Sequence, residues 1–153
     1  MIVRKATVKD VETLIRLRLD YLTEDGYSLP SVEREALSSR LRCYFSEHIG
    51  KDFVAVLAEE EGVVVSSAYL AVIEKPASPA FITGRAGTLM NVLTYAPYRR
   101  RGIATRVLQR MIDEAKQLGV SVIDLFATKD GELLYRKLGF TEPGYTAMRL
   151  SLR

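Results

Sequence analysis

The sequence predicts a mixed α/β fold with a mostly antiparallel central sheet that contains one parallel strand pair. A strand–helix–strand unit spans Gly87–Ala127, and strands connected in this way pair in parallel through a right-handed crossover. The apolar segments Phe53–Ala58 and Val63–Ile73 are separated by a short polar stretch, which predicts an antiparallel hairpin. Segment Ala104–Leu118 keeps its apolar residues on one helical face. At 153 residues, the chain fits a single domain, 1–153.

The N-terminal part is expected to form a short strand followed by two helices. Thr7 and Asp10 have the spacing of a capping box, in which each side chain accepts a hydrogen bond from a free backbone N–H at a helix start. Apolar residues then recur at helical spacing. The elements expected here are a strand at Ile2–Ala6, a helix from Val11 to about Asp25, and a helix from Ser31 to about His48.

The C-terminal part is expected to alternate strands and helices. Segment Val120–Ala127 is almost continuously apolar, which predicts a strand covered on both faces and therefore helices on both faces of the sheet. From Thr146 to Arg153, apolar and polar residues alternate, which predicts a half-exposed final strand. The other elements expected are a strand at Gly87–Tyr95, a helix at Ala104–Leu118 and a short helix at about Gly131–Leu138.

Composition excludes several classes of protein. The net charge of +3 is too small to indicate a nucleic-acid binder, because a local basic cluster matters more than the total. A single cysteine, Cys43, rules out an intramolecular disulfide framework and a multi-cysteine zinc site. The first residues lack an apolar signal core, and the longest nearly apolar run, Val63–Ile73, is about half a membrane span. We therefore expect a soluble cytoplasmic protein without membrane contact.

The chemically informative segment is the strand-to-helix junction Tyr98–Ala104. A helix that starts here presents unpaired backbone N–H groups and the positive end of its dipole. Gly102 has no Cβ to keep a ligand away from the backbone. Arginines at a helix start oppose the dipole by about 0.3–1 kcal/mol each, so three in a row, Arg99–Arg101, favour a bound anion. The alternative is a solvated arginine cluster.

Two motifs make the chain similar to a known family. The pattern Arg99-x-x-Gly102-x-Ala104 resembles the R/Q-x-x-G-x-G/A phosphate-binding loop of the GNAT superfamily of acyl-CoA-dependent N-acetyltransferases. The segment Leu134–Phe140 resembles the second motif of that family. The order of elements also matches over nearly the whole chain. The resemblance implies a GNAT-like fold and an N-acetyltransferase that uses acetyl-CoA, without metal, on a small-molecule or protein amine.

The resemblance also implies roles for individual residues. The backbone of the junction would bind the pyrophosphate of coenzyme A, and the preceding strand would pair with the pantetheine arm. Thr128 stands where many relatives carry an asparagine that contacts this arm, so it is a substitute for that contact. The cofactor-binding residues implied are Val92, Leu93, Thr94, Arg99, Arg100, Arg101, Gly102, Ile103, Ala104 and Thr128.

Tyr135 is the expected catalytic residue, because relatives use a tyrosine here to hydrogen-bond or protonate the leaving sulfur. A phenol with a pKa near 10 can share a proton with a thiolate whose pKa is near 8.5. The alternative is a tyrosine that only packs on the sheet. Asn91 is the second candidate, and it could either orient a water or the acceptor, or cap a strand irregularity.

The general base is not evident from the sequence. The acidic residues of the first two helices are expected to be ordinary solvated carboxylates, His48 a helix-end residue, and Cys43 a packing residue. The polar residues of this region that could serve as a base are Glu24, Asp25, Glu47 and His48.

Three hypotheses about function follow from these residues. The first is an N-acetyltransferase that attacks the thioester directly in a ternary complex. The second is a CoA-binding sensing or interaction module without transferase activity. The third, a small nucleic-acid binder that uses Arg99–Arg101, is disfavoured because no exposed aromatic residues are interleaved with the arginines. A homodimer is expected from base rates alone.

Overall fold

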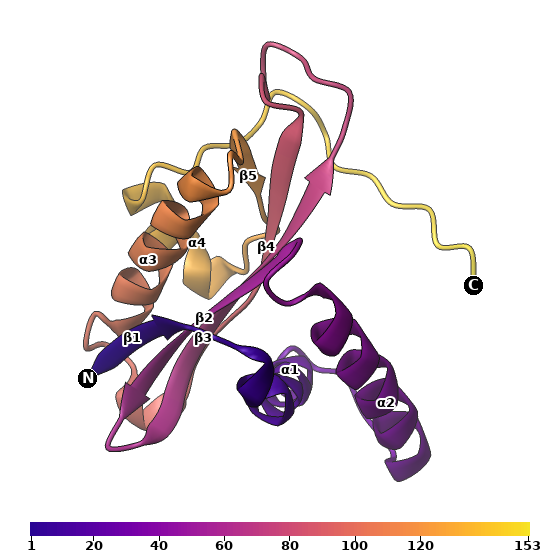
Figure 1. Cartoon of the computed structure of the whole chain (residues 1–153), viewed down its shortest axis with the longest axis vertical. Coiled ribbons are helices and arrows are strands. Elements are labelled where there is room, and N and C mark those ends of the chain that lie inside the picture. Colours follow the sequence, from indigo (N-terminus) through magenta and orange to yellow (C-terminus); the bar gives the residue numbers. More distant parts are fainter.

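A computed structural model describes residues 1–153 and contains one five-stranded sheet with helices on both faces (Figure 1). This arrangement confirms the predicted fold class. A 3-10 turn precedes the first helix, and a second precedes the third helix. In chain order the elements are β1 (Ile2–Lys5), α1 (Val11–Glu24), α2 (Ser31–His48), β2 (Phe53–Glu60), β3 (Val63–Glu74), β4 (Arg85–Thr94), α3 (Ile103–Gln117), β5 (Val122–Asp124) and α4 (Lys129–Lys137).

The strands follow one another across the sheet in the order β1-β2-β3-β4-β5. The first four are antiparallel neighbours. β4 and β5 form the parallel pair, joined through α3 as the strand–helix–strand pattern predicts. Their pairing covers only Ala86–Thr88 of β4 against Val122–Asp124 of β5. Beyond Thr88, β4 therefore continues without a strand on that edge.

Two apolar cores hold the layers together. On one face, α1 and α2 pack on the sheet around Leu14, Phe45 and Tyr69. On the other face, α3 packs through Val107 and Met111. α1 and α2 lie on the opposite side of the sheet from α3 in Figure 1. None of the helices combines the length and the apolar character needed to cross a membrane.

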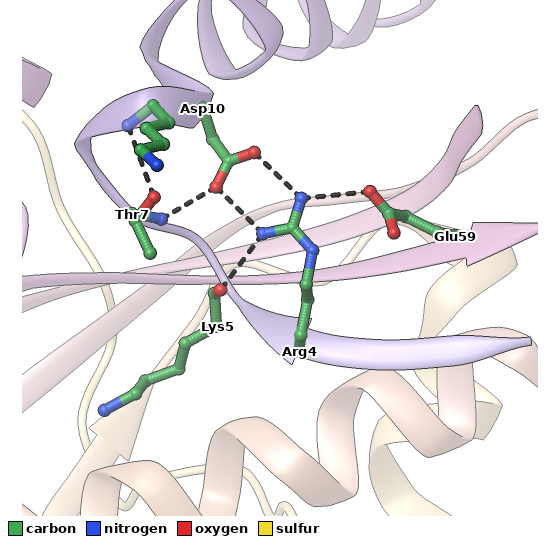
Figure 2. A network of polar contacts seen from close by, with 6 residues as sticks. Arg4, Lys5, Thr7, Asp10 and Glu59 are labelled. Carbon is green, nitrogen blue, oxygen red and sulfur yellow. Dashed lines mark hydrogen bonds and ion pairs between the residues drawn. The ribbon is translucent and has the colours of Figure 1, made fainter. Parts of the chain in front are cut away.

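Arg4 connects the first strand to the start of the first helix (Figure 2). Its guanidinium donates to both carboxylate oxygens of Asp10 at 2.8 Å and to Glu59 Oε1 at 3.0 Å. The Thr7 backbone N–H donates to Asp10 at 2.7 Å, and the Thr7 hydroxyl accepts from the Lys9 N–H, which confirms the predicted capping box. Hydrogen bonds from Arg4 lower the pKa of Asp10. The network fixes where α1 begins relative to the sheet.

The structure corrects two predictions for the C-terminal part. The strand predicted at Val120–Ala127 has only three residues, and it is half-buried or exposed rather than covered on both faces. The reason is that β5 has a neighbouring strand on one edge only. The strand predicted at Thr146–Arg153 is an exposed coil, because no strand edge lies beside it to accept its hydrogen bonds.

Candidate functional site

The start of α3 presents a run of free backbone donors. The six consecutive N–H groups from Arg100 to Thr105 donate to no backbone or side-chain acceptor; the Arg106 N–H makes the first bond of the helix, to the Gly102 carbonyl at 3.2 Å. No side chain caps this helix. Free N–H groups and the helix dipole together favour an anion. The geometry predicted for the junction is therefore present.

The backbone of the junction is shaped by two left-handed residues. Arg100 has φ 62° and Gly102 has φ 74°. The position of Gly102 favours glycine because a side chain is strained at this φ. A Cβ built at Gly102 would contact nothing within 4 Å, so the space beside this part of the loop is open. Backbone of this kind forms concave anion-binding surfaces.

Two of the three arginines are already paired with carboxylates. Arg99 donates to Glu24 of α1 at 3.0 Å and, through Nε, to the Thr94 carbonyl at 2.8 Å. The Arg101 guanidinium lies 3.7 Å from Glu60. Arg100 alone makes no ion pair. Carboxylates distant in sequence therefore pair with two of the three arginines, so the arginines give a weaker argument for a bound anion than their number indicates. The free N–H groups provide the stronger argument.

The strand before the junction offers a free backbone edge. From Leu89 to Thr94, β4 has β3 on one side and no strand on the other. Leu93 is buried in the core on the side of α1 and α2, Val92 packs against the core on the side of α3, and Val92 and Thr94 are half-buried. Side-chain packing therefore leaves the outer backbone edge available to an extended ligand.

Asn91 sits at an irregularity in β4. The register with β3 shifts between Ser67 and Tyr69, and Asn91 has φ 55°. Its buried amide is used within the protein, since Oδ1 accepts from Arg18 and Nδ2 donates to the Leu17 carbonyl, both at 3.3 Å. Of the two interpretations of Asn91, this geometry favours the residue that stabilises a strand irregularity.

Tyr135 lies on α4, half-buried and packed edge-on against Phe140. No protein group forms a hydrogen bond with its hydroxyl. A Cβ on Gly131 would lie 2.9 Å from the Tyr135 ring, so the absence of a side chain at Gly131 leaves room for the ring. Sequence reasoning did not identify Gly131, although a glycine in the first turn of a helix was a signal for it.

The environment of Tyr135 keeps its phenol protonated. Burial, together with a smaller contribution from the phenol of Tyr21 on α1, raises the pKa of Tyr135 to about 12. The pKa of Tyr21 is itself raised by burial and by Asp25. At neutral pH the Tyr135 hydroxyl therefore remains available as a hydrogen-bond donor.

A tyrosine at the end of β4 ties the junction to α1. The Tyr95 hydroxyl donates to Asp20 Oδ2 at 2.5 Å. Burial raises the pKa of Tyr95 to about 12, with the hydrogen bond to Asp20 as the second cause. This pair was not predicted, because the two residues lie far apart in the sequence and neither belongs to a motif.

Thr128 has a local structural role. Its hydroxyl accepts from the Gly131 N–H at 3.3 Å and caps α4. Its Oγ is therefore occupied by the helix that carries Tyr135. The side chain itself is exposed.

The other polar residues considered as bases have ordinary surroundings. Glu24 pairs with Arg99, Asp25 ends α1, and Glu47 is exposed on α2. His48 Nδ1 lies 2.7 Å from Asp52, and its ring stacks on Tyr44. No three His, Cys, Asp or Glu side chains gather where they could hold a metal ion. Cys43 is exposed, so its predicted packing role was wrong; Tyr44 and Phe45 occupy the inward face instead.

The model of the Acetyltransferase (GNAT) family matches residues 13–140, which include the junction, β4 and Tyr135. The chain belongs to the GNAT acetyltransferase family. Its sheet is the one described above, in which the parallel pairing of β4 with β5 ends at Thr88, before the junction.

Solved and curated relatives agree with the family. A predicted acetyltransferase with acetyl-CoA from Clostridium acetobutylicum is 32% identical, with a TM-score of 0.87 over 99% of this chain and 96% of that chain. A GCN5-related N-acetyltransferase from Ralstonia eutropha JMP134 shares the fold at 22% identity, with a TM-score of 0.82 over 97% of each chain.

Among curated proteins, the probable glucosamine 6-phosphate N-acetyltransferase 2 of Oryza sativa subsp. japonica is 30% identical over 102 residues. The match covers 63% of this chain, and the chain spans about 58% of the length of that relative.

Proposed function

We propose that residues 1–153 form one acetyltransferase domain that transfers the acetyl group of acetyl-CoA to a primary amine. The observation that carries the proposal is the run of six free N–H groups at the start of α3, directly after a strand with one free edge. Membership of the GNAT family supports the reaction class. The amine belongs to a small molecule or to a protein.

The junction binds the diphosphate of acetyl-CoA through backbone donors. The free amides from Arg100 to Ala104 surround the anion, whereas the Arg99 N–H donates to the Ala96 carbonyl within the protein. Arg100 supplies the one cation of the cluster without a carboxylate partner. Arg99 and Arg101 position the loop through Glu24 and Glu60. The open space beside Gly102 supports this assignment, because backbone donors reach a phosphate only where no side chain intervenes.

The edge of β4 aligns the thioester. An extended pantetheine arm pairs with backbone groups from Val92 to Thr94 as an added strand would. The irregularity at Asn91 turns backbone groups out of the regular ladder. Such N–H groups stabilise the oxyanion that forms when the amine nitrogen attacks the carbonyl carbon.

Tyr135 acts on the leaving group as a hydrogen-bond donor. The amine nitrogen bonds to the carbonyl carbon and the carbon–sulfur bond breaks. The sulfur takes the electron pair, and the new amide nitrogen loses its proton to water. Complete proton transfer from a phenol of pKa about 12 to a thiolate of pKa about 8.5 is uphill by about 5 kcal/mol. A hydrogen bond to the thiolate avoids that cost, and the hydroxyl without a protein partner is free to make it.

The experiment combines calorimetric titration of CoA with a thiol-release assay over a panel of amines. The panel includes peptides with free N-termini and glucosamine 6-phosphate, the substrate in the name of the rice relative. We expect CoA binding and transfer to at least one amine. Failure to bind acetyl-CoA would overturn the proposal. Tight CoA binding without acetylation of any amine would instead favour the alternative, a CoA-sensing or interaction module.

The matched variant is Tyr135→Phe, which keeps the ring and removes the hydroxyl. We expect the kcat to fall by about 10-fold to 100-fold, because a hydrogen bond to a charged group contributes about 1.5–3 kcal/mol. The Kd for acetyl-CoA should change by less than about twofold, since the hydroxyl stabilises the leaving thiolate, which forms only during the reaction. Wild-type kcat in this variant, with chemistry rate-limiting, would exclude the donor role.

A further inference from the structure

Arg18 is a half-buried cation on α1 that no carboxylate neutralises. The ion pairs of α1 use Glu12 and Glu24, and neither of them includes Arg18. Its guanidinium donates through Nη1 to Asn91 Oδ1 at 3.3 Å. A guanidinium carries several N–H donors, so the others remain free for a ligand. Because a charge removed from water is costly unless it is paired, this position favours a bound anion.

Arg18 lies beside the groups to which we assign the thioester. Asn91, its hydrogen-bond partner, stands at the irregularity of β4 with φ 55°. On α1 itself, burial and Asp25 raise the pKa of Tyr21, whereas the charge of Arg18 lowers it. The Tyr21 phenol in turn adds, after burial, to the raised pKa of Tyr135. Arg18 is therefore adjacent to the strand irregularity and to Tyr21, and Tyr21 connects it to Tyr135.

The other groups near Arg18 do not neutralise its charge. Burial raises the pKa of Tyr69 and of Tyr21 against the opposing effect of Arg18, so both phenols are uncharged at neutral pH. Asp20 follows two residues later on α1, but its carboxylate accepts from the Tyr95 hydroxyl. The positive charge of Arg18 is therefore left without an ion-pair partner, and an acidic group of a ligand would supply one.

We propose, resting on the function proposed above, that the acceptor carries a carboxylate or a phosphate close to its amine and that Arg18 binds this group. The planar guanidinium matches both kinds of oxyanion through two parallel hydrogen bonds. Binding in this way anchors the acidic end of the acceptor on α1 and directs its amine to the thioester at β4. Because Arg18 contacts the residue at the irregularity directly, the acid and the amine are separated by only a few bonds. The acceptor is therefore a small acidic amine.

Pairs of amines that differ in the acidic group test this preference on the wild-type protein. The thiol-release assay compares β-alanine with propylamine, and O-phosphoethanolamine with ethanolamine. We expect kcat/KM to be at least about tenfold higher for the acidic member of one pair, because a hydrogen bond between charged groups discriminates to that extent. The pair that responds identifies the group as a carboxylate or a phosphate. Transfer with equal kcat/KM within both pairs would overturn the anion site and leave the proposed function standing.

Substitutions of Arg18 locate the preference. Arg18→Gln should lower kcat/KM for the acidic amine by at least about tenfold and change that of its uncharged partner by less than about threefold. Arg18→Lys keeps the charge without the planar fork and should restore part of the loss. The matched control is Arg40→Gln, because Arg40 is exposed on α2 and the ion pairs of that helix use Arg42 and His48. Equal losses for acidic and uncharged amines would overturn the proposal in favour of a role toward the thioester.

Calorimetric titration separates failure of the anion site from failure of the proposed function. Each of the four amines is titrated into the wild type and into Arg18→Gln in the presence of CoA, which has no acetyl group to transfer. Binding of an acidic amine that Arg18→Gln weakens by at least about tenfold supports the anion site even if no amine is acetylated, and in that case the proposed function alone fails. If acidic amines show no advantage in binding or in transfer, the anion site is overturned.

Discussion

The substitution Gly131→Ala tests whether the position of the Tyr135 ring limits the reaction. The added Cβ would lie 2.9 Å from Tyr135 Cε2 and 3.5 Å from Cζ, whereas ordinary van der Waals contact begins at 3.4 Å. The ring must therefore retreat by about 0.5 Å. Because a 1 Å misplacement can cost about 100-fold in rate, we expect the kcat to fall by about tenfold.

The same substitution should leave the fold intact. Alanine is favoured over glycine in a helix by up to about 1 kcal/mol, which offsets the displacement of a ring that can move. We therefore expect the free energy of unfolding to change by less than about 1 kcal/mol while the kcat falls. Urea denaturation and the thiol-release assay measure the two quantities on the same preparation.

A double-mutant comparison isolates the mechanism. In a Tyr135→Phe background there is no hydroxyl to misplace, so Gly131→Ala should have little further effect on kcat. Gly144→Ala is the matched control, because a Cβ there contacts nothing within 4 Å and its φ lies outside the left-handed region. The reasoning is refuted if Gly131→Ala keeps the wild-type kcat, or if it lowers kcat equally in both backgrounds.

Three further predictions concern the junction, the Arg4 network and pH. Gly102→Ala should weaken acetyl-CoA binding and cost about 1–2 kcal/mol of stability, since φ is 74° there; calorimetry and urea denaturation test both effects. Asp10→Asn should lower the free energy of unfolding by about 1–2 kcal/mol at pH 7. Because hydrogen bonds from Arg4 lower the folded pKa of Asp10, its contribution is present above the ordinary carboxyl value and lost as pH falls through the folded value. The difference between wild type and variant should therefore shrink as pH falls below 3.8, and an undiminished difference at the lowest pH at which both proteins still fold would refute the assignment. Finally, a Tyr135 pKa of about 12 predicts that any loss of kcat between pH 7 and pH 10 has the same midpoint in Tyr135→Phe; a loss confined to the wild type would contradict it.

Local sequence patterns predicted most of the fold because they depend on neighbouring residues. The capping spacing of Thr7 and Asp10 placed the start of the first helical region, and the apolar period of α3 placed that helix. The hairpin of β2 and β3 followed from a short polar connection between two apolar runs. In each case the residues that determine the element lie within a few turns or within one hairpin.

The prediction of a C-terminal strand failed because a strand needs a second strand to pair with, and the alternating pattern does not specify one. Alternation from Thr146 to Arg153 fixes which side chains share a face, but hydrogen bonding requires a second edge in reach. The continuous apolar character of Val120–Ala127 likewise indicated contacts on both sides without specifying their source.

The sequence predicted the backbone features of the candidate site, but it predicted the side-chain contacts only in part. Gly102 and the helix start indicated free N–H groups, since both are local features. The partners of Arg99 and Arg101 could not be found, because Glu24 and Glu60 reach them only through the tertiary fold. The role of Asn91 could not be predicted either, because its hydrogen-bond partners Arg18 and Leu17 lie on α1.

The hydrogen bonds between α1 and the junction limit how the protein can be redesigned. The Tyr95 hydroxyl donates to Asp20 and the Arg99 guanidinium donates to Glu24. Two consecutive turns of α1 therefore hold the segment that connects β4 to α3. A library that randomises this helix would also loosen the loop to which we assign the diphosphate of acetyl-CoA. Mutagenesis should keep Asp20 and Glu24 constant and vary neighbours such as Tyr21, so that changes in selectivity can be separated from losses in coenzyme affinity.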